Sequence, residues 1–324
     1  MKKLDKFYSV APMMGKTDSF FCYLLNLINK KTVVYTEMMH AEAIIRTNIL
    51  DDYNYLNNIN NVAVQIAGNE PSRLALAAKK AAEKDFYEIN INCGCPSNRV
   101  VSGSFGISLL LNPKQVRRCA EEISRYTNKN ISIKTRIGVD DYTSENILDN
   151  FLVELNNASI NKYIIHARIA IREKLNTKDN LNIPPLDYER VFKLKKKFKN
   201  NTIIINGGFK HTNYNENIKR KIDGIMIGRE AYSYPKKLEN VDSNFYGIKD
   251  TNSSLSDITK NMFNYFETQK NQNDIKKGLI HMHGLYNGLK NAKKIRVLLS
   301  NSCYFKPAKN EIIDLINDNF ENVA

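Results

Sequence analysis

The sequence YEININCGCP, residues 87–96, begins as a strand and ends abruptly in a turn. Polar and apolar residues alternate in its first half, which favours a β-strand with Asn90 and Asn92 on one face. Gly94 then permits a turn that other residues resist, and the closing proline cannot donate to a sheet. Cys95 is therefore expected at the carboxyl end of a strand, a place that suits chemistry. A small buried thiol in a structural turn is the alternative.

Seven other β-prone segments accompany this one, and most precede a longer helical pattern. The expected strands are residues 7–10, 32–37, 62–67, 87–92, 131–136, 163–168, 202–206 and 224–228. Helical periodicity covers residues 18–28, 72–83, 113–125, 143–156 and 188–198. Eight β-then-α units in about 230 residues predict a (β/α)8 TIM barrel of the α/β class, and a doubly wound parallel sheet is the competing architecture.

Polar residues follow every expected strand, and this favours the barrel. Such residues converge on one mouth only if the sheet closes. They are Pro12, Met13, Glu37, Gln65, Asn92, Cys95, Lys134, Arg136, His166, Arg168, Asn206, Gly207, Gly208, Gly228 and Arg229, with the apolar Met13 included for its position.

The sequence changes character after residue 235. Residues 236–256 are polar and predict a linker, and the helical patterns beyond them predict three or four short helices in a small bundle. We therefore expect a barrel domain at 1–240 and a helical domain at 241–324. Residues 172–185 lack a clear period and follow the sixth strand, so they form a candidate substrate loop.

Composition limits the class of protein. The chain has 324 residues and a net charge of +14, from 48 basic and 34 acidic residues. This charge suits a polyanion such as RNA, although a base-composition bias toward Asn, Lys and Ile is an alternative cause. No apolar run approaches the ~20 residues that span a bilayer, and no signal peptide is evident, so we expect a cytoplasmic protein without membrane contact.

Cysteine and histidine spacing predicts no metal site. The cysteines are odd in number and form no CxxC pair, which argues against a disulfide framework and a zinc site. His281 and His283 are two residues apart, so a helix would splay them, and we expect packing or surface roles.

The last two strands end in sequences typical of a phosphate site. Asn206-Gly207-Gly208 and Gly228-Arg229 combine backbone N–H groups that a phosphate can approach with an arginine fork. A plain chain turn is the alternative. A phosphate there would place flavin mononucleotide (FMN) across the mouth.

Three side chains could then face the flavin ring. Gln65 can pair with its amide edge, Lys134 can stabilise negative charge on the reduced ring, and His166 fits beside it. A thiol is mostly protonated at neutral pH, so Cys95 could act as a general acid opposite a hydride donor. The C5=C6 bond of a pyrimidine is a substrate that needs both partners.

Eight motifs in order resemble the tRNA-dihydrouridine synthases. They are APMM at 11–14, YTEM at 35–38, VQIAG at 64–68, EININCGCP at 88–96, IKTRIG at 133–138, IHAR at 165–168, INGG at 205–208 and MIGREAY at 226–232. The likeness covers residues 7–235 and weakens in the tail. The phrase IPPLDY at 183–188 and the basic tail resemble the bacterial A-type subfamily.

This resemblance implies reduction of uridine to 5,6-dihydrouridine in the tRNA D-loop, at position 20 or 20a. It implies FMN as cofactor and NADPH or NADH as reductant. Cys95 would protonate C5 after a hydride reaches C6. The residues implied to hold FMN are Pro12, Met13, Met14, Gln65, Lys134, His166, Asn206, Gly207, Gly208, Gly228 and Arg229.

The same resemblance implies contacts with tRNA. Asn92 would contact the uracil edge, and Lys178, Lys293 and Arg296 would contact the tRNA body. Leu181 stands where the subfamily usually carries an arginine. Residues 195–197, three lysines in a row, more often form a solvated helix face than an RNA contact.

Other readings stay open from the sequence. One is an FMN barrel that acts on a free pyrimidine, as dihydroorotate dehydrogenases do, and another is a non-catalytic RNA-binding protein. No dinucleotide fingerprint chooses between NADPH and NADH. The target uridine and the preferred tRNAs are not readable, and for the oligomeric state we expect a monomer.

Overall fold

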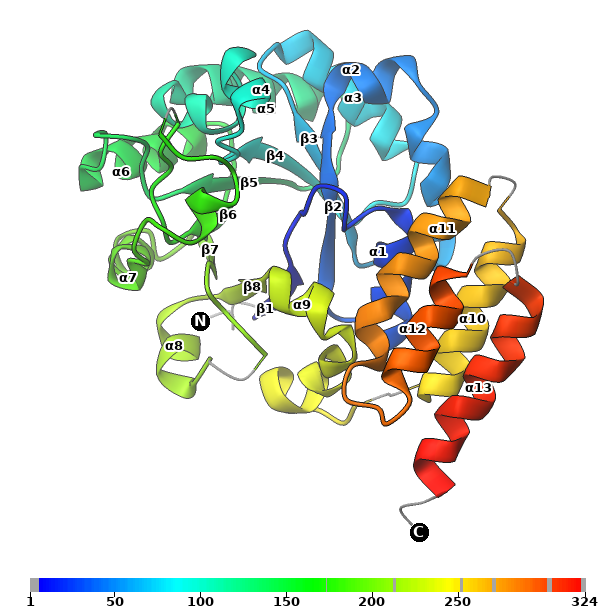
Figure 1. Ribbon diagram of the computed structural model, residues 1–324. Coiled ribbons are helices and arrows are strands. Elements are labelled where there is room, and N and C mark those ends of the chain that lie inside the picture. The colour runs from blue at the N-terminus through cyan, green and yellow to red at the C-terminus, as the bar shows by residue number, and fades with distance from the viewer. Residues whose placement is uncertain are drawn as a thin grey trace.

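The computed structural model describes residues 6–172, 174–211, 214–250, 253–269, 272–301 and 305–321. Within these ranges the strands close into a parallel barrel in which β8 pairs with β1 (Figure 1). The strands are β1 (Phe7–Val10), β2 (Val33–His40), β3 (Val62–Ala67), β4 (Ile89–Cys93), β5 (Ile131–Arg136), β6 (Lys162–His166), β7 (Thr202–Asn206) and β8 (Gly224–Ile227). The predicted TIM barrel is confirmed, and the closed strand order excludes the doubly wound sheet.

Helices surround the barrel. They are α1 (Ser19–Ile28), α2 (Ala41–Arg46), α3 (Pro71–Ala82), α4 (Asn98–Ser102), α5 (Pro113–Tyr126), α6 (Glu145–Asn156), α7 (Tyr188–Lys197), α8 (Glu216–Lys221) and α9 (Arg229–Ser233). Polar caps begin several of them; Asp18 Oδ1, for example, accepts from the backbone N–H of Phe21 at 3.1 Å. The sequence did not predict α2, α4, α8 and α9, because five or six residues are too few to show a helical period.

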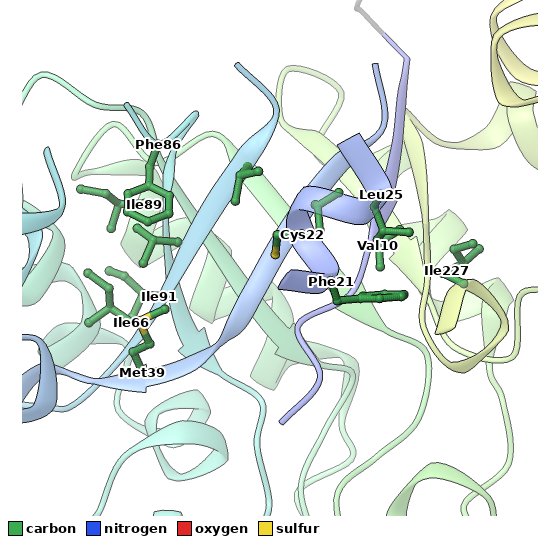
Figure 2. Packing of buried hydrophobic residues seen from close by; sticks show 14 of the residues in the cluster. Val10, Phe21, Cys22, Leu25, Met39, Ile66, Phe86, Ile89, Ile91 and Ile227 are labelled. Carbon is green, nitrogen blue, oxygen red and sulfur yellow. The ribbon is translucent and has the colours of Figure 1, made fainter. Parts of the chain in front are cut away.

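Two buried layers stabilise the barrel. Alternate strand residues, among them Tyr35, Ile164 and Met226, form a small cluster that fills the interior. The residues between them point outward and pack against the helices in one large cluster. Figure 2 shows part of this outer layer, where Phe21 and Leu25 of α1 belong to the same cluster as strand residues.

The chain after β8 continues as short helical turns and then as a bundle. A 3-10 helix (Pro235–Asn240) and a π-helical turn (Asp242–Tyr246) come first. Then follow α10 (Leu255–Glu267), α11 (Gln272–His281), a 3-10 helix (Met282–Tyr286), α12 (Ala292–Ser300) and α13 (Phe305–Glu321). The linker prediction is wrong for residues 236–246, because Leu238, Val241 and Phe245 are buried and fix this segment.

The bundle packs beside α1 (Figure 1). The ring of Tyr23 lies 4.4 Å from that of Tyr265, and the ring of Phe20 lies 5.8 Å from that of Phe266, measured between centroids. The helix that follows the first barrel loop therefore carries the bundle. None of the helices in the described ranges is both long enough and apolar enough to cross a membrane.

Candidate active site

Cys95 lies in a tight turn just beyond β4. The side-chain oxygen of Asn92 accepts hydrogen bonds from the backbone N–H groups of Gly94, at 3.2 Å, and Cys95, at 3.0 Å. A Cβ on residue 94 would come within 3.2 Å of the Thr135 backbone, so glycine lets the turn lie against β5. The Cys95 thiol stays partly exposed, with its sulfur 3.4 Å from the hydroxyl oxygen of Ser97. The thiol is therefore at a strand end, as the sequence predicted.

Strand register brings other predicted residues to the same end of the barrel. Arg136, His166 and Asn206 are paired neighbours on β5, β6 and β7, so their side chains leave the sheet on the same side. Two residues before Arg136, Lys134 pairs with Asn92 of β4 and donates from its ammonium to Asn206 Oδ1 at 3.1 Å. The mouth thus gathers side chains from four consecutive strands.

The amide of Gln65 is held by two asparagines of β4. Its Nε2 donates to Asn90 Oδ1 at 2.7 Å, and its Oε1 accepts from Asn92 Nδ2 at 2.8 Å. All three side chains are buried. Gln65 keeps one N–H hydrogen and one lone pair, and Asn92 keeps one N–H hydrogen, so the expected ring and uracil contacts are restricted to these groups.

Basic side chains meet at the mouth without carboxylate partners. Lys134 donates to an amide oxygen, Arg136 donates to the carbonyl oxygens of Gly94, Ile169 and Asn180, and Arg168 donates to a carbonyl oxygen. Among the described residues, which leave out Glu173, no carboxylate lies within ion-pair distance of these three cations. Arg136 and Arg168 were expected at strand ends, but their sequence positions alone assigned them no binding role.

Burial and neighbouring positive charge shift the pKa values of the groups at the mouth. Burial, with the positive charge of Arg136 as a second cause, lowers the pKa of Lys134 to about 7. Burial and the neighbouring Arg136 and Lys134 hold the pKa of His166 well below its ordinary value. The buried Nδ1 of His166 and Nη1 of Arg168 have no hydrogen-bond partner in the described part of the chain. Buried donors and charges of this kind are costly unless paired, so the mouth fits an anionic ligand.

Two glycines shape the end of β7. Gly207 has φ +118° and Gly208 has φ +69°, both in the region that favours glycine. A Cβ on Gly208 would lie 2.6 Å from Leu186 Cδ1, and one on Gly207 would lie 2.9 Å from Leu186 Cδ2. Tyr188 donates from its hydroxyl to the Gly207 carbonyl at 2.7 Å. The two glycines therefore let the backbone turn closely against Leu186, and such a glycine turn at a strand end suits close approach by a phosphate group.

We expect Gly208→Ala to lower the free energy of unfolding by about 1–3 kcal/mol, because the new methyl group meets Leu186 in a left-handed backbone. Gly247→Ala is the matched control: its φ is +67°, but no atom lies within 4 Å of the new Cβ. Urea unfolding of both variants measures the difference. An equal loss in the two variants would show that the contact with Leu186 costs nothing.

The loops after β1 and β8 lie close to each other. A Cβ on Gly228 would lie 3.9 Å from the sulfur of Met13, while Met14 is 62% exposed and Pro12 is half-buried. Arg229 does not point to open space, because its Nη1 donates to Asn182 Oδ1 at 2.8 Å. This hydrogen bond links Arg229, which is expected to bind the phosphate, to the candidate substrate loop.

The residues expected to contact tRNA lie on two parts of the molecule. Lys178 is exposed on the substrate loop, whereas Lys293 and Arg296 lie on α12. Arg296 Nη1 donates to Asn287 Oδ1 at 2.9 Å, and Asn287 donates to the carbonyl oxygen of Ser233 at 2.7 Å. These bonds link α12 to the end of α9, which follows the Gly228-Arg229 sequence.

Three other basic or histidine residues noted in the sequence form contacts within the protein. Lys195 pairs with Asp223 and Lys197 with Asp149, both at 2.7 Å. His281 is buried, with its Nε2 2.9 Å from Asp18 Oδ2, and so connects the bundle to the cap of α1. This link needs residues far apart in sequence, and no local pattern predicted it.

Comparisons with known proteins agree on one family. The sequence model described as dihydrouridine synthase (Dus) matches residues 9–319. A tRNA-dihydrouridine(20/20a) synthase of Escherichia coli K12 is 37% identical over 92% of this chain and 86% of its own length. One from Shewanella oneidensis is 35% identical over 97% of this chain and 94% of its own length.

Solved structures share the fold at much lower identity. Morphinone reductase matches with a TM-score of 0.52 at 9% identity, over 78% of this chain and 88% of its own. An old yellow enzyme homologue from Zymomonas mobilis has the same TM-score and identity, over 78% of this chain and 91% of its own. At this identity the likeness concerns the barrel fold alone.

Proposed function

Because the chain belongs to the dihydrouridine synthase family, we propose that it reduces uridines 20 and 20a of tRNA to 5,6-dihydrouridine. The observation that carries the proposal is the placement of Cys95, a partly exposed thiol at the rim of a cationic barrel mouth. A negative charge on the Cys95 sulfur would raise the pKa values of both Lys134 and Arg136, so the three groups lie within electrostatic reach of one another.

The residues at the mouth fit FMN. The glycine turn at Gly207 and Gly208 would receive its phosphate, and Arg229 would add positive charge from the neighbouring loop. The unpaired Nδ1 of His166 and the cationic Lys134 would meet the polar edge of the ring, together with the free amide positions of Gln65. Asn206 would orient Lys134, and the loop with Pro12, Met13 and Met14 would cover one side.

When bound, FMN would supply a hydride to C6 of the uracil ring and be reduced again by NADPH or NADH. The protein itself would supply the proton. Cys95 would give its thiol proton to C5, completing saturation of the C5=C6 bond, and would recover a proton from solvent. The turn held by Asn92 keeps the sulfur in place for this transfer. Lys134 would stabilise negative charge on the reduced flavin ring.

The base must leave the tRNA stack to reach the mouth. Lys178 would contact the tRNA near the mouth, and Lys293 and Arg296 would contact its phosphates from α12. At Leu181, the backbone carbonyl lies 3.5 Å from Arg229 Nη2. We keep the expectation of a monomer in the cytoplasm.

We expect Lys293→Gln combined with Arg296→Gln to weaken tRNA binding and to make it less dependent on salt. Each lost phosphate contact should reduce the slope of log affinity against log salt by about 1. Lys196→Gln is the control, because this exposed lysine lies on α7, on the other side of the barrel in Figure 1. Filter binding at several salt concentrations measures the slopes, and equal slopes for both variants would contradict a tRNA surface on α12.

Substrate size tests the proposed function directly. Full-length protein with FMN and NADPH should convert unmodified tRNA and leave free uridine and orotate unreduced, because binding energy from the tRNA body is needed to place one base. Product is measured by mass spectrometry of nucleosides. Turnover of the free pyrimidines at the rate seen with tRNA would favour a small-molecule enzyme instead.

A further inference from the structure

A chain of hydrogen bonds runs through the barrel interior, away from the Cys95 turn. Asn92 accepts from the turn and donates to Gln65, which donates to Asn90. Asn90 Nδ2 then donates to Ser132 Oγ, and Ser132 Oγ donates to Glu88 Oε1, each at 2.7 Å. All the members past the turn are buried. The hydrogen-bond chain thus connects the turn at the mouth to the carboxylate of Glu88, just before β4.

The two ends of this chain impose the same direction on it. At the mouth, the backbone N–H groups of Gly94 and Cys95 can only donate. At the other end, the Glu88 carboxylate can only accept. Each of the three amides between them therefore has one orientation that satisfies both neighbours, with its oxygen toward the mouth. Reversing any one amide would leave two donors or two acceptors in contact, which is costly when buried.

Glu88 is fixed by more than this chain. The carboxylate also accepts from the hydroxyl of Tyr35 and, at 2.7 Å, from the ammonium of Lys162. Lys162 lies over the rings of Phe7 and Tyr87, at 4.4 and 5.1 Å from their centroids. Glu88 is 1% exposed. Removing one member of a buried ion pair leaves the other uncompensated, so the pair holds the end of the chain firmly.

We propose that Glu88, with Lys162, is a positioning unit that orients the amides of Asn90, Gln65 and Asn92 and thereby fixes the turn that carries Cys95. Within the described residues, Glu88 is linked to the mouth through these side chains and does not touch it directly, so it is a positioning residue and not a catalytic one. The proposal rests on the proposed function of the mouth, because it assigns a role to the turn there.

In Glu88→Gln, no orientation of the new amide should satisfy both Lys162 and the rest of the hydrogen-bond chain. The new amide can turn its oxygen toward Ser132 and Tyr35 only by turning its nitrogen toward the Lys162 ammonium, another donor. The opposite orientation satisfies Lys162 but places a donor against Ser132, which reverses the chain and conflicts with the backbone N–H groups. Adding Lys162→Gln supplies an amide oxygen that can accept from the new nitrogen. The double variant should therefore recover the original direction.

The experiment measures dihydrouridine formation with tRNA at saturating NADPH, the KM for tRNA, FMN affinity by fluorescence quenching and the melting temperature. We expect Glu88→Gln to lower kcat about tenfold, with the KM for tRNA changed less than about twofold. The double variant should return kcat to within about threefold of the wild-type value. Ser132→Ala cuts the chain but leaves the ion pair, and it should also lower kcat; it serves if Glu88→Gln does not fold.

Asp149→Asn is the control for a buried ion pair, since Asp149 pairs with Arg190 and Lys197 on the outer helices. It should lower the melting temperature without lowering kcat. The proposal is overturned if Glu88→Gln and Ser132→Ala keep wild-type kcat, or if the double variant is no faster than Glu88→Gln. A wild-type protein that binds FMN yet forms no dihydrouridine would contradict the proposed function itself, and the FMN affinities of the variants would then test the amide orientation separately.

Discussion

Cys95→Ala is expected to reduce dihydrouridine formation by about 10²–10⁴-fold, the usual contribution of a general acid. The variant should still bind FMN and still oxidise NADPH slowly, because the thiol belongs to the turn after β4 and not to the glycine turn at Gly207 and Gly208 after β7. A single-turnover experiment separates these steps: the protein is reduced first, tRNA is added, and dihydrouridine is counted by mass spectrometry.

Cys119→Ala controls for the loss of a thiol as such. Cys119 is buried on α5, and burial raises the pKa of its thiol to about 12, so it has no means to donate a proton at the mouth. We expect normal product formation from this variant. Normal product formation from Cys95→Ala would instead show that the C5 proton comes from another group.

Lys134→Met is expected to weaken FMN binding by about 10–100-fold, the usual worth of a hydrogen bond to a charged group. Lys134 lies at the mouth, and its side-chain hydrogen bond goes to the neutral Asn206. Methionine keeps most of the volume and removes the charge. Fluorescence quenching of FMN gives the dissociation constant.

The pH dependence of FMN binding tests the same residue. With a pKa of about 7 in the free protein, Lys134 loses its proton as the pH rises above 7. An anionic ligand favours the protonated form, so binding raises this pKa and takes up a proton. Affinity should therefore fall between pH 7 and pH 9, by at most about tenfold per pH unit.

Two variants complete this pH test. Lys134→Met should remove the pH dependence over the window from pH 7 to pH 9, because the titrating group is gone. Lys196→Met, on the exposed face of α7, should keep it. A wild-type affinity that stays constant from pH 7 to pH 9 would show that the protonation of Lys134 does not govern FMN binding.

The barrel was predictable because its strands are short, apolar and separated by helical periods. Seven strands lie within two residues of their expected bounds, and β2 extends further, to His40. This extension follows a register irregularity between Tyr35 and Met38, which lets the strand continue along β3. A local pattern cannot show such an irregularity, since it depends on the neighbouring strand.

The gathering of candidate residues at the mouth was predictable where position along a strand was enough. Lys134, His166 and Asn206 lie near the carboxyl ends of their strands and Cys95 follows β4, and closure of the barrel brings these strand ends together. The chain of hydrogen bonds that ends at Glu88 was not predictable, because it depends on which residues of neighbouring strands are paired by the register. Register pairs Asn90 with Ser132 and Ser132 with Lys162, and nothing within one segment shows this alignment.

If this barrel reduces particular uridines of tRNA, the product should appear at defined positions. Those positions are measured by sequence-resolved mapping of dihydrouridine in tRNA made without modifications and incubated with the full-length protein, FMN and NADPH. We predict dihydrouridine at positions 20 and 20a. Dihydrouridine at other D-loop positions only, or none in any tRNA with FMN bound to the protein, would contradict it.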